Sequence, residues 1–335
     1  MACTEPADFV PRGTGRSSLR PTNYMPFFSV SYSIVRRIPA SPPRRLLRFL
    51  SPLVLLACFV SLAPSQVSTG SGPNDLFARV IANQKKSEIL LDQYERLQRI
   101  EKRRTGSDPD PAETRVLRLF PVGTGVDKLL MSMDGKPTAA DAHRVDLENL
   151  EKYLLWVLQE GPPQKEAYAK AERKRKERFD LMDATHQAFI FNFDGKELRE
   201  NRTLLRYSIV PNPKYRPTSH NTVLFTKVRG TIWIDEQSSE LAKVEGTVAE
   251  DFSIALFLAK VYKGSHFMQE RYQIAPGVWE PTFEQYDFDG RKYLLPYAIH
   301  ERTFYSDYKH DGPPKEALEL VRAELSKLPA DQGTH

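Results

Sequence analysis

From Ala188 onward, apolar and polar residues alternate along the chain with a period of two. Phenylalanines occupy every second position of 189–193, and Leu205, Tyr207 and Ile209 alternate with a second set of residues. Successive side chains of a strand point to opposite faces, so each run predicts a strand with one apolar face. Short turn signals separate these runs without helical patterns between them, and this succession predicts an antiparallel sheet.

Upstream of Ala188 the pattern contains both helical and strand periods. Asn74-Asp75 can cap a short N-terminal helix, and the segments 115–122 and 127–133 predict two strands before a turn at Asp134-Gly135. The sequence therefore predicts that strands begin before the helical segment described next.

A helical insertion is predicted over residues 138–185. Leucines at helical spacing indicate an amphipathic helix over 141–158, which Thr138 to Asp141 would open as a capping box. Gly161-Pro162-Pro163 ends it, and a second helix is expected over 164–184, whose mixed-sign run 171–178 is interpreted as a solvated face. The last strand is expected over about 294–304, and a short C-terminal helix over 314–328.

Residues 1–65 form a basic leader. Arginines precede an apolar segment at 49–63, which is followed by a polar boundary, and this order is typical of a signal peptide. The apolar segment is shorter than the ~20 residues that span a bilayer, although an uncleaved N-terminal anchor is the alternative. Met25 is a possible start of the chain. Residues 66–335 are then expected to form a single domain, exported to the periplasm.

Cys58 lies within Leu-Leu-Ala-Cys, which resembles the lipidation motif of a membrane-anchored lipoprotein, but the apolar segment continues after it. Lipidation at Cys58 is therefore an alternative that would place the protein on a membrane. Cys3 is the only other cysteine. A mature chain that begins near Gln66 would contain no cysteine, which excludes thiol catalysis and suits an oxidising compartment.

The formal charge of +5 is unevenly distributed. The leader carries eight arginines against Glu5 and Asp8, a balance of +6, so that the remaining residues have a balance of −1. The body of the protein thus lacks the basic character expected of a nucleic-acid-binding domain. Nucleic acid is not an expected partner.

Two hairpin segments carry a resemblance to a known family. Val228 to Asp235 followed by Leu241 to Gly246, and later Gly277 to Pro281, resemble the hairpins and turns of outer-membrane lipoprotein-sorting proteins of the LolA/LolB-like group. The resemblance implies an α+β fold: an open, curved antiparallel β half-barrel with helices packed over its concave face, in a family whose cavity accepts acyl chains. It also favours a strand within Leu90 to Arg103, where apolar residues at helical spacing would favour a helix.

The apolar face of this sheet is the candidate ligand site. A curved sheet that does not close must cover its apolar face, and the helix at 141–158 is the expected cover. The face predicted to bind a ligand comprises Phe189, Phe191, Phe193, Leu205, Tyr207, Ile209, Ile232 and Ile234, with Leu150 and Leu154 from the helix. Alternation alone does not distinguish such a pocket from a dry core.

Motifs of catalytic and metal sites are absent from the sequence. The histidines are dispersed, and the sequence contains no phosphate loop, nucleophile elbow or His-Glu-x-x-His motif. Glu280, Glu284 and Asp287 are interpreted as surface carboxylates on a strand. We therefore expect no enzyme activity, no cofactor and no metal.

Two functions remain open. The first is a periplasmic binding or carrier protein for lipid, an acylated protein or another apolar ligand. The second is a structural or interaction protein of the cell envelope, anchored through the leader or Cys58 and partnered by other envelope proteins, with a filled interior.

Overall fold

The computed structural model describes residues 73–254, 259–293 and 295–328. The predicted leader, its apolar segment 49–63 and Cys58 lie outside the described residues. Within them, the first half of the chain contains these elements: α1 (Pro73–Leu90), η1 (Leu91–Gln93), β1 (Tyr94–Lys102), β2 (Glu113–Pro121), β3 (Val126–Met133), β4 (Lys136–Pro137), α2 (Ala140–Val157) and α3 (Pro162–Ala188).

The second half is almost entirely strand. Its elements are β5 (Phe189–Arg199), β6 (Arg202–Pro211), η2 (His220–Thr226), β7 (Val228–Asp235), β8 (Leu241–Val248), β9 (Phe252–Ile254), β10 (Ala259–Val261), β11 (His266–Ala275), β12 (Val278–Lys292), β13 (Leu295–His310) and α4 (Pro314–Leu325). The change of period at Ala188 coincides with the junction between α3 and β5.

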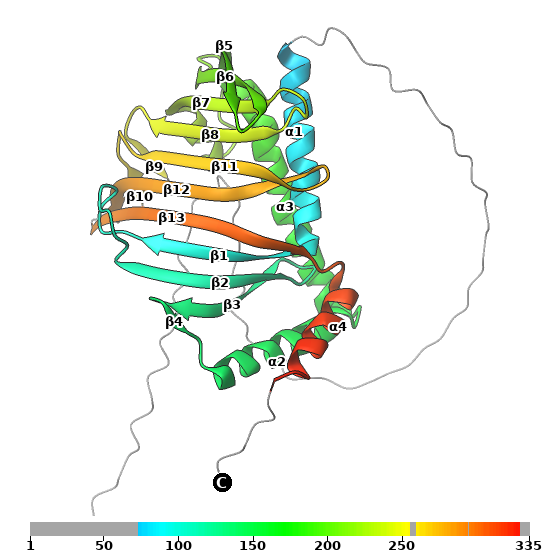
Figure 1. Ribbon diagram of the computed structural model, residues 1–335. Coiled ribbons are helices and arrows are strands. Elements are labelled where there is room, and N and C mark those ends of the chain that lie inside the picture. The colour runs from blue at the N-terminus through cyan, green and yellow to red at the C-terminus, as the bar shows by residue number, and fades with distance from the viewer. Residues whose placement is uncertain (1–72, 255–258, 294, 329–335) are drawn as a thin grey trace, which may run out of the picture.

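All described strands belong to one 13-stranded antiparallel sheet. Its order is β4-β3-β2-β1-β13-β12-β11-β8-β7-β6-β5, with the short β10 and β9 added beside β12. The end strands β4 and β5 do not pair with each other, so the sheet is open (Figure 1). This confirms the predicted α+β fold with an open antiparallel sheet.

The helices divide between two regions of the sheet. In Figure 1, α1 and α3 run across the direction of the strands, while α2 and α4 lie together beyond β3 and β4. One apolar cluster joins α1 and α3 to β5–β8 and β11, and a second joins α2 and α4 to β2 and β3. The pair α1 and α3 therefore covers the apolar part of the sheet.

The prediction that the helix at 141–158 covers the apolar face was wrong. Leu150 and Leu154 on α2 are fully buried, but they pack against Phe120, Leu129 and Leu318 in the second cluster. Both α2 and α4 present an apolar stripe, and the two stripes bury each other at the end of the sheet. These two leucines are not part of the face lined by β5–β8.

Three local predictions also differ from the structure. The helix α2 begins after Ala139 without a side-chain cap, because the Thr138 hydroxyl donates to the Leu130 carbonyl 2.5 Å away instead of capping the helix. The N-terminal helix is longer than expected, extending to Leu90. The last strand continues to His310, beyond the predicted end near Phe304.

The strand predicted within Leu90 to Arg103 is confirmed as β1. Its pairing with β13 shifts register between Glu95 and Leu97. The extra residue at this point belongs to β13, where four residues, 306–309, lie opposite three of β1. The side chains of β1 therefore keep alternating between the two faces, and Leu97 and Ile100, three residues apart, lie on opposite faces.

Candidate functional site

A pocket lies between α1, α3 and the sheet, and its lining is mostly apolar. It has a volume of about 180 Å³. A dry cavity of about 150 Å³ is enough to bind benzene, so this space admits a ring or part of an acyl chain. The sheet contributes these apolar lining residues: Phe189, Phe191, Ile209, Val228, Ile232, Leu241, Val244 and Phe267.

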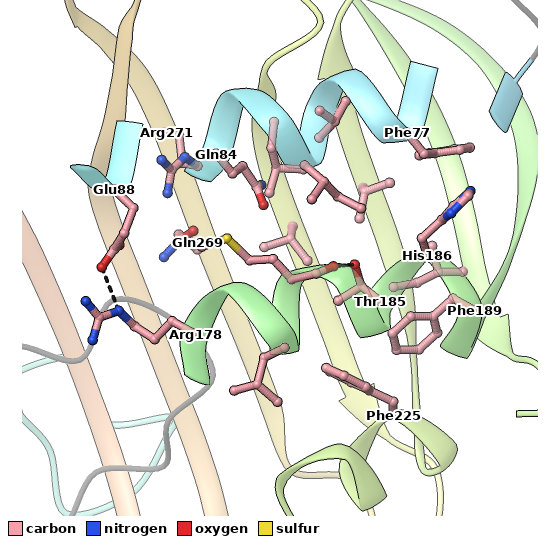
Figure 2. Close-up of a pocket in the computed structure, with 18 of the residues that line it drawn as sticks. Phe77, Gln84, Glu88, Arg178, Thr185, His186, Phe189, Phe225, Gln269 and Arg271 are labelled. Atoms are coloured by element: carbon pink, nitrogen blue, oxygen red, sulfur yellow. Dashed lines mark hydrogen bonds and ion pairs between the residues drawn. The ribbon is translucent and has the colours of Figure 1, made fainter. Parts of the chain in front are cut away.

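Each covering helix contributes one face to the pocket. The residues from α1 are Phe77, Val80, Ile81, Gln84 and Glu88, and those from α3 are Arg178, Leu181, Met182, Thr185 and His186. Both sets recur at intervals of three or four residues, which places them on one side of a helix. Figure 2 shows the two helices facing each other across the pocket.

Aromatic rings close one end of the pocket. The Phe77 ring stacks on Phe191 with 4.0 Å between centroids and meets the edge of Tyr207 at 5.1 Å. Phe189 and Phe225 meet edge to face at 5.5 Å. These contacts fix the position of α1 over β5 and β6 and give this end an apolar wall.

Gly246 makes room for the Phe267 ring on the floor of the pocket. A Cβ atom at Gly246 would lie 2.5 Å from this ring. The backbone of β8 can therefore approach Phe267, because glycine has no side chain there.

The structure brings four of the predicted residues to the pocket surface: Phe189, Phe191, Ile209 and Ile232. Leu205, Tyr207 and Ile234 lie in the same apolar cluster without lining the pocket. Phe193 is on the same strand but remains 55% exposed. Alternation thus identified the face of the sheet that borders the pocket, while the packing of α1 and α3 determines which residues of that face line it.

The opposite end of the pocket is polar. Glu88 on α1 and Arg178 on α3 form an ion pair of 2.6 Å at this end, near Gln269 and Arg271 of β11 (Figure 2). Glu280 of β12 also lines the pocket. The site therefore combines an apolar chamber with charged groups at one end.

Ion pairs connect the two covering helices. Lys85 Nζ lies 2.6 Å from an Asp183 carboxylate oxygen, and Arg175 on α3 pairs with Asp92 in η1. Two arginines of the charged run 171–178 form ion pairs outside α3: Arg175 with Asp92 of η1 and Arg178 with Glu88 of α1. The run is consequently not only a solvated face.

Glu280 and Glu284 are buried, so their interpretation as surface carboxylates was wrong. They are 1% and 3% exposed, because β12 is an internal strand of the sheet and α1 crosses it. Burial raises the pKa of Glu280 to about 8, although Arg271 and Arg96 oppose the shift. Burial likewise raises the pKa of Glu284 to about 7, against hydrogen bonds from Gln269 and Tyr305.

Sequence reasoning also missed the contribution of α1 and α3. The one-face spacing of Phe77, Val80 and Ile81 was the available signal, since it marks a buried helix stripe. For Glu280 the sequence held no comparable signal, because carboxylates are usually exposed.

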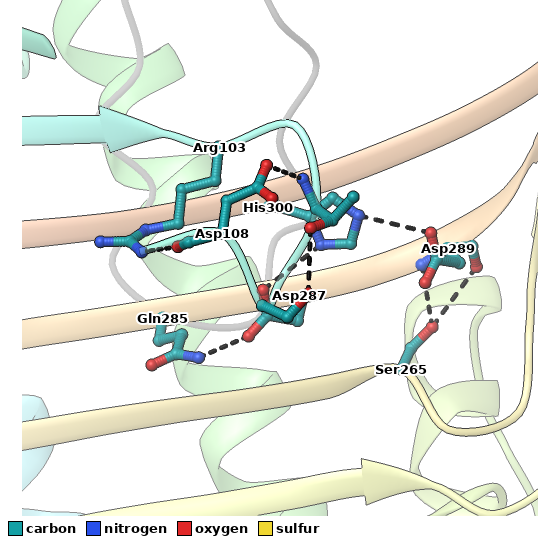
Figure 3. Close-up of polar contacts among 9 residues, drawn as sticks. Arg103, Asp108, Ser265, Gln285, Asp287, Asp289 and His300 are labelled. Carbon is teal, nitrogen blue, oxygen red and sulfur yellow. Dashed lines mark hydrogen bonds and ion pairs between the residues drawn. The ribbon is translucent and has the colours of Figure 1, made fainter. Parts of the chain in front are cut away.

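A second polar cluster lies away from the pocket, where β12 and β13 meet the segment after β1. His300 Nδ1 lies 3.3 Å from Asp287, and His300 Nε2 lies 3.4 Å from Asp289 (Figure 3). The Arg103 backbone N–H donates to the His300 carbonyl, and the Arg103 side chain donates to carbonyls of Asp108 and Pro109. These contacts hold the segment 103–112 against the sheet.

Neither a metal-binding group nor a membrane-spanning helix was found where the structure is described. Across 73–254, 259–293 and 295–328, no three histidine, cysteine or acidic side chains are grouped so that they could hold a metal ion. In the same ranges, each helix is too short or too polar to cross a bilayer.

Comparison with solved structures finds two similar chains. One is a domain assigned to outer-membrane lipoprotein sorting from Vibrio parahaemolyticus, with 12% identity and a TM-score of 0.29, covering 70% of this chain and 92% of that one. The other is a LolA superfamily protein from Nitrosomonas europaea, with 9% identity and a TM-score of 0.25, covering 72% and 96%. No family model and no curated protein matches the chain.

Proposed function

We propose that the protein binds an apolar ligand, such as an acyl chain of a lipid or an acylated protein, in the pocket beneath α1 and α3. It would act as a carrier or binding protein of the periplasm and release the ligand chemically unchanged. The observation that carries the proposal is the apolar lining of this pocket, which three phenylalanines of the sheet and the apolar faces of two helices supply.

The alternative of a purely structural envelope protein predicted a filled interior. A pocket of about 180 Å³ inside the main apolar cluster favours binding over that alternative. Surrounding an acyl chain with such a lining removes apolar surface from water, at ~25 cal/mol for each Å². Export is supported by the order of basic, apolar and polar residues in the leader.

Access to the pocket would require α1 and α3 to separate. The Lys85–Asp183 pair is partly exposed, and exposed pairs contribute roughly 0–1 kcal/mol, so its loss is a small obstacle to opening. The Glu88–Arg178 pair is more buried, so separating these two charges is the larger electrostatic cost of opening. The aromatic contacts of Phe77 would keep the other end of α1 in place.

A bulky side chain in the pocket is expected to abolish ligand binding. Thr185 lines the pocket from α3, and its hydroxyl bonds only to the Met182 carbonyl of the same helix among the contacts described. We expect Thr185→Trp to weaken binding of the uncharged dye N-phenyl-1-naphthylamine by about tenfold or more, a loss of ~1.4 kcal/mol, because the indole occupies the ligand's space. Fluorescence titration measures this.

Gln187→Trp is the matched control. Gln187 is exposed on the same helix and is not part of the lining. The dye affinity of this variant should equal that of the unmodified protein. Equal affinity of both tryptophan variants would contradict binding in this pocket.

A further inference from the structure

The polar end of the pocket contains two buried atoms without a hydrogen-bond partner. One is Oε1 of Glu280 and the other is Nε of Arg271, and both residues line the pocket. Their closest mutual approach is 3.9 Å, from an Arg271 terminal nitrogen to Glu280 Oε2, which is too long for a hydrogen bond. A buried polar atom without a partner is unfavourable, so such atoms at the end of a pocket indicate a missing group.

Arg271 is held in place by a contact that leaves its Nε–H free. One terminal nitrogen donates to the Trp279 carbonyl at 2.7 Å. A neutral carbonyl thus holds the guanidinium group in position, and the Arg271 side chain is only 11% exposed. A buried guanidinium in this position favours an anionic ligand group, preferably a flat carboxylate.

We infer that the pocket takes a long-chain carboxylic acid, with the part of the chain next to the carboxyl group in the apolar chamber and the carboxyl group between Arg271 and Glu280. This rests on the proposed function and names its ligand class. Two adjacent carboxyl groups avoid repulsion when they share one proton, which gives a strong O–H···O hydrogen bond. One shared proton and the Arg271 cation make the assembly of ligand, Glu280 and Arg271 electrically neutral.

The surroundings of Glu280 agree with this charge balance. The positively charged groups near Glu280 are Arg271 on β11 and Arg96 on β1. The acidic groups and the tyrosine around it are Glu88 on α1, Glu240 before β8, Glu284 on β12 and Tyr308 on β13. Glu88 is itself paired with Arg178 of α3. Burial is the largest influence and raises the pKa of Glu280 to about 8. At neutral pH Glu280 therefore carries the proton that a ligand carboxylate needs.

An equal-length ligand series tests the inference. Dodecanoate, dodecan-1-ol and dodecylamine would each compete for the pocket against N-phenyl-1-naphthylamine on delipidated protein. At pH 7 we expect dodecanoate to bind about tenfold more tightly than the alcohol, since only the acid pairs with the guanidinium, and we expect the amine to bind weakest.

The affinity for dodecanoate is also expected to depend on pH. Above a pKa of about 8 Glu280 loses its proton and repels the ligand, so affinity should fall about tenfold from pH 7 to pH 9, while dodecan-1-ol binding stays constant. Glu280→Gln keeps a permanent N–H donor, so it should retain dodecanoate binding without this pH dependence. Arg271→Met should lose the preference for the acid over the alcohol, and far-UV circular dichroism verifies that the variant is folded.

The outcomes separate this inference from the proposed function. Equal affinities for acid and alcohol, tighter binding of the amine, or unchanged dodecanoate affinity at pH 9 would overturn the carboxyl site while leaving the apolar pocket established. Failure of dye and all three ligands to bind would overturn both.

Discussion

Leu154→Ala is expected to lower the free energy of unfolding by roughly 2–5 kcal/mol without changing ligand affinity. Leu154 is fully buried between α2, α4 and the end of the sheet, in the cluster that also contains Leu147 and Val321. Removal of its side chain leaves a cavity in a packed region, and the loss of stability combines the transfer free energy with the cavity term.

The neighbouring residue provides the control. Leu155 on the same helix is 39% exposed, so Leu155→Ala should change stability much less. Urea unfolding followed by circular dichroism measures both variants, and dye titration under native conditions measures the pocket. A tenfold change of dye affinity in Leu154→Ala would mean that α2 contributes to the ligand site, contrary to the observed packing.

The second large effect is a loss of stability with rising pH, carried by Glu284. Its carboxylate accepts hydrogen bonds from Gln269 at 2.7 Å and Tyr305 at 2.9 Å, yet burial raises its pKa from 4.5 to about 7. Between these values the folded protein binds more protons than the unfolded chain. The stabilisation is therefore complete below about pH 4.5, declines as pH rises to about 7, and is absent above it.

Glu284→Gln should remove the part of this dependence that Glu284 contributes, because the amide resembles the protonated carboxyl, while the part contributed by Glu280 remains. We expect the variant and the unmodified protein to have similar stability at pH 5, and the variant to be more stable at pH 8.5 by on the order of 3 kcal/mol. Urea unfolding at both pH values measures the difference. Glu177→Gln, at an exposed position of α3, is the control and should follow the unmodified protein.

Equal destabilisation of Glu284→Gln at both pH values would contradict this explanation. It would show that the carboxylate is required in its charged form and that Gln269 and Tyr305 compensate fully for its burial.

The strands were the most predictable part of the fold. Alternation is a local property, so Phe189, Phe191, Ile209 and Ile232 could be assigned to one face from sequence alone, and the structure places them together around the pocket. The same pattern also included Phe193, which is exposed. Alternation specifies the face on which a side chain lies, but not which positions along β5 are covered by α1.

The docking of helices and the burial of charges could not be predicted in this way. The leucine stripe of α2 indicates that the helix is buried against something, but it does not specify whether the partner is the main sheet face or α4. Glu280 and Glu284 are buried because of strand order, a long-range property that places β12 between β11 and β13.

The most direct test of an apolar ligand in the pocket is native mass spectrometry of the protein isolated from the cells that produce it, before and after extraction with organic solvent. We expect a bound mass of lipid size that extraction removes and that Thr185→Trp fails to retain, while Gln187→Trp retains it. A bare polypeptide mass in every preparation, with no uptake when lipid is added back, would contradict the binding of an apolar ligand in this pocket.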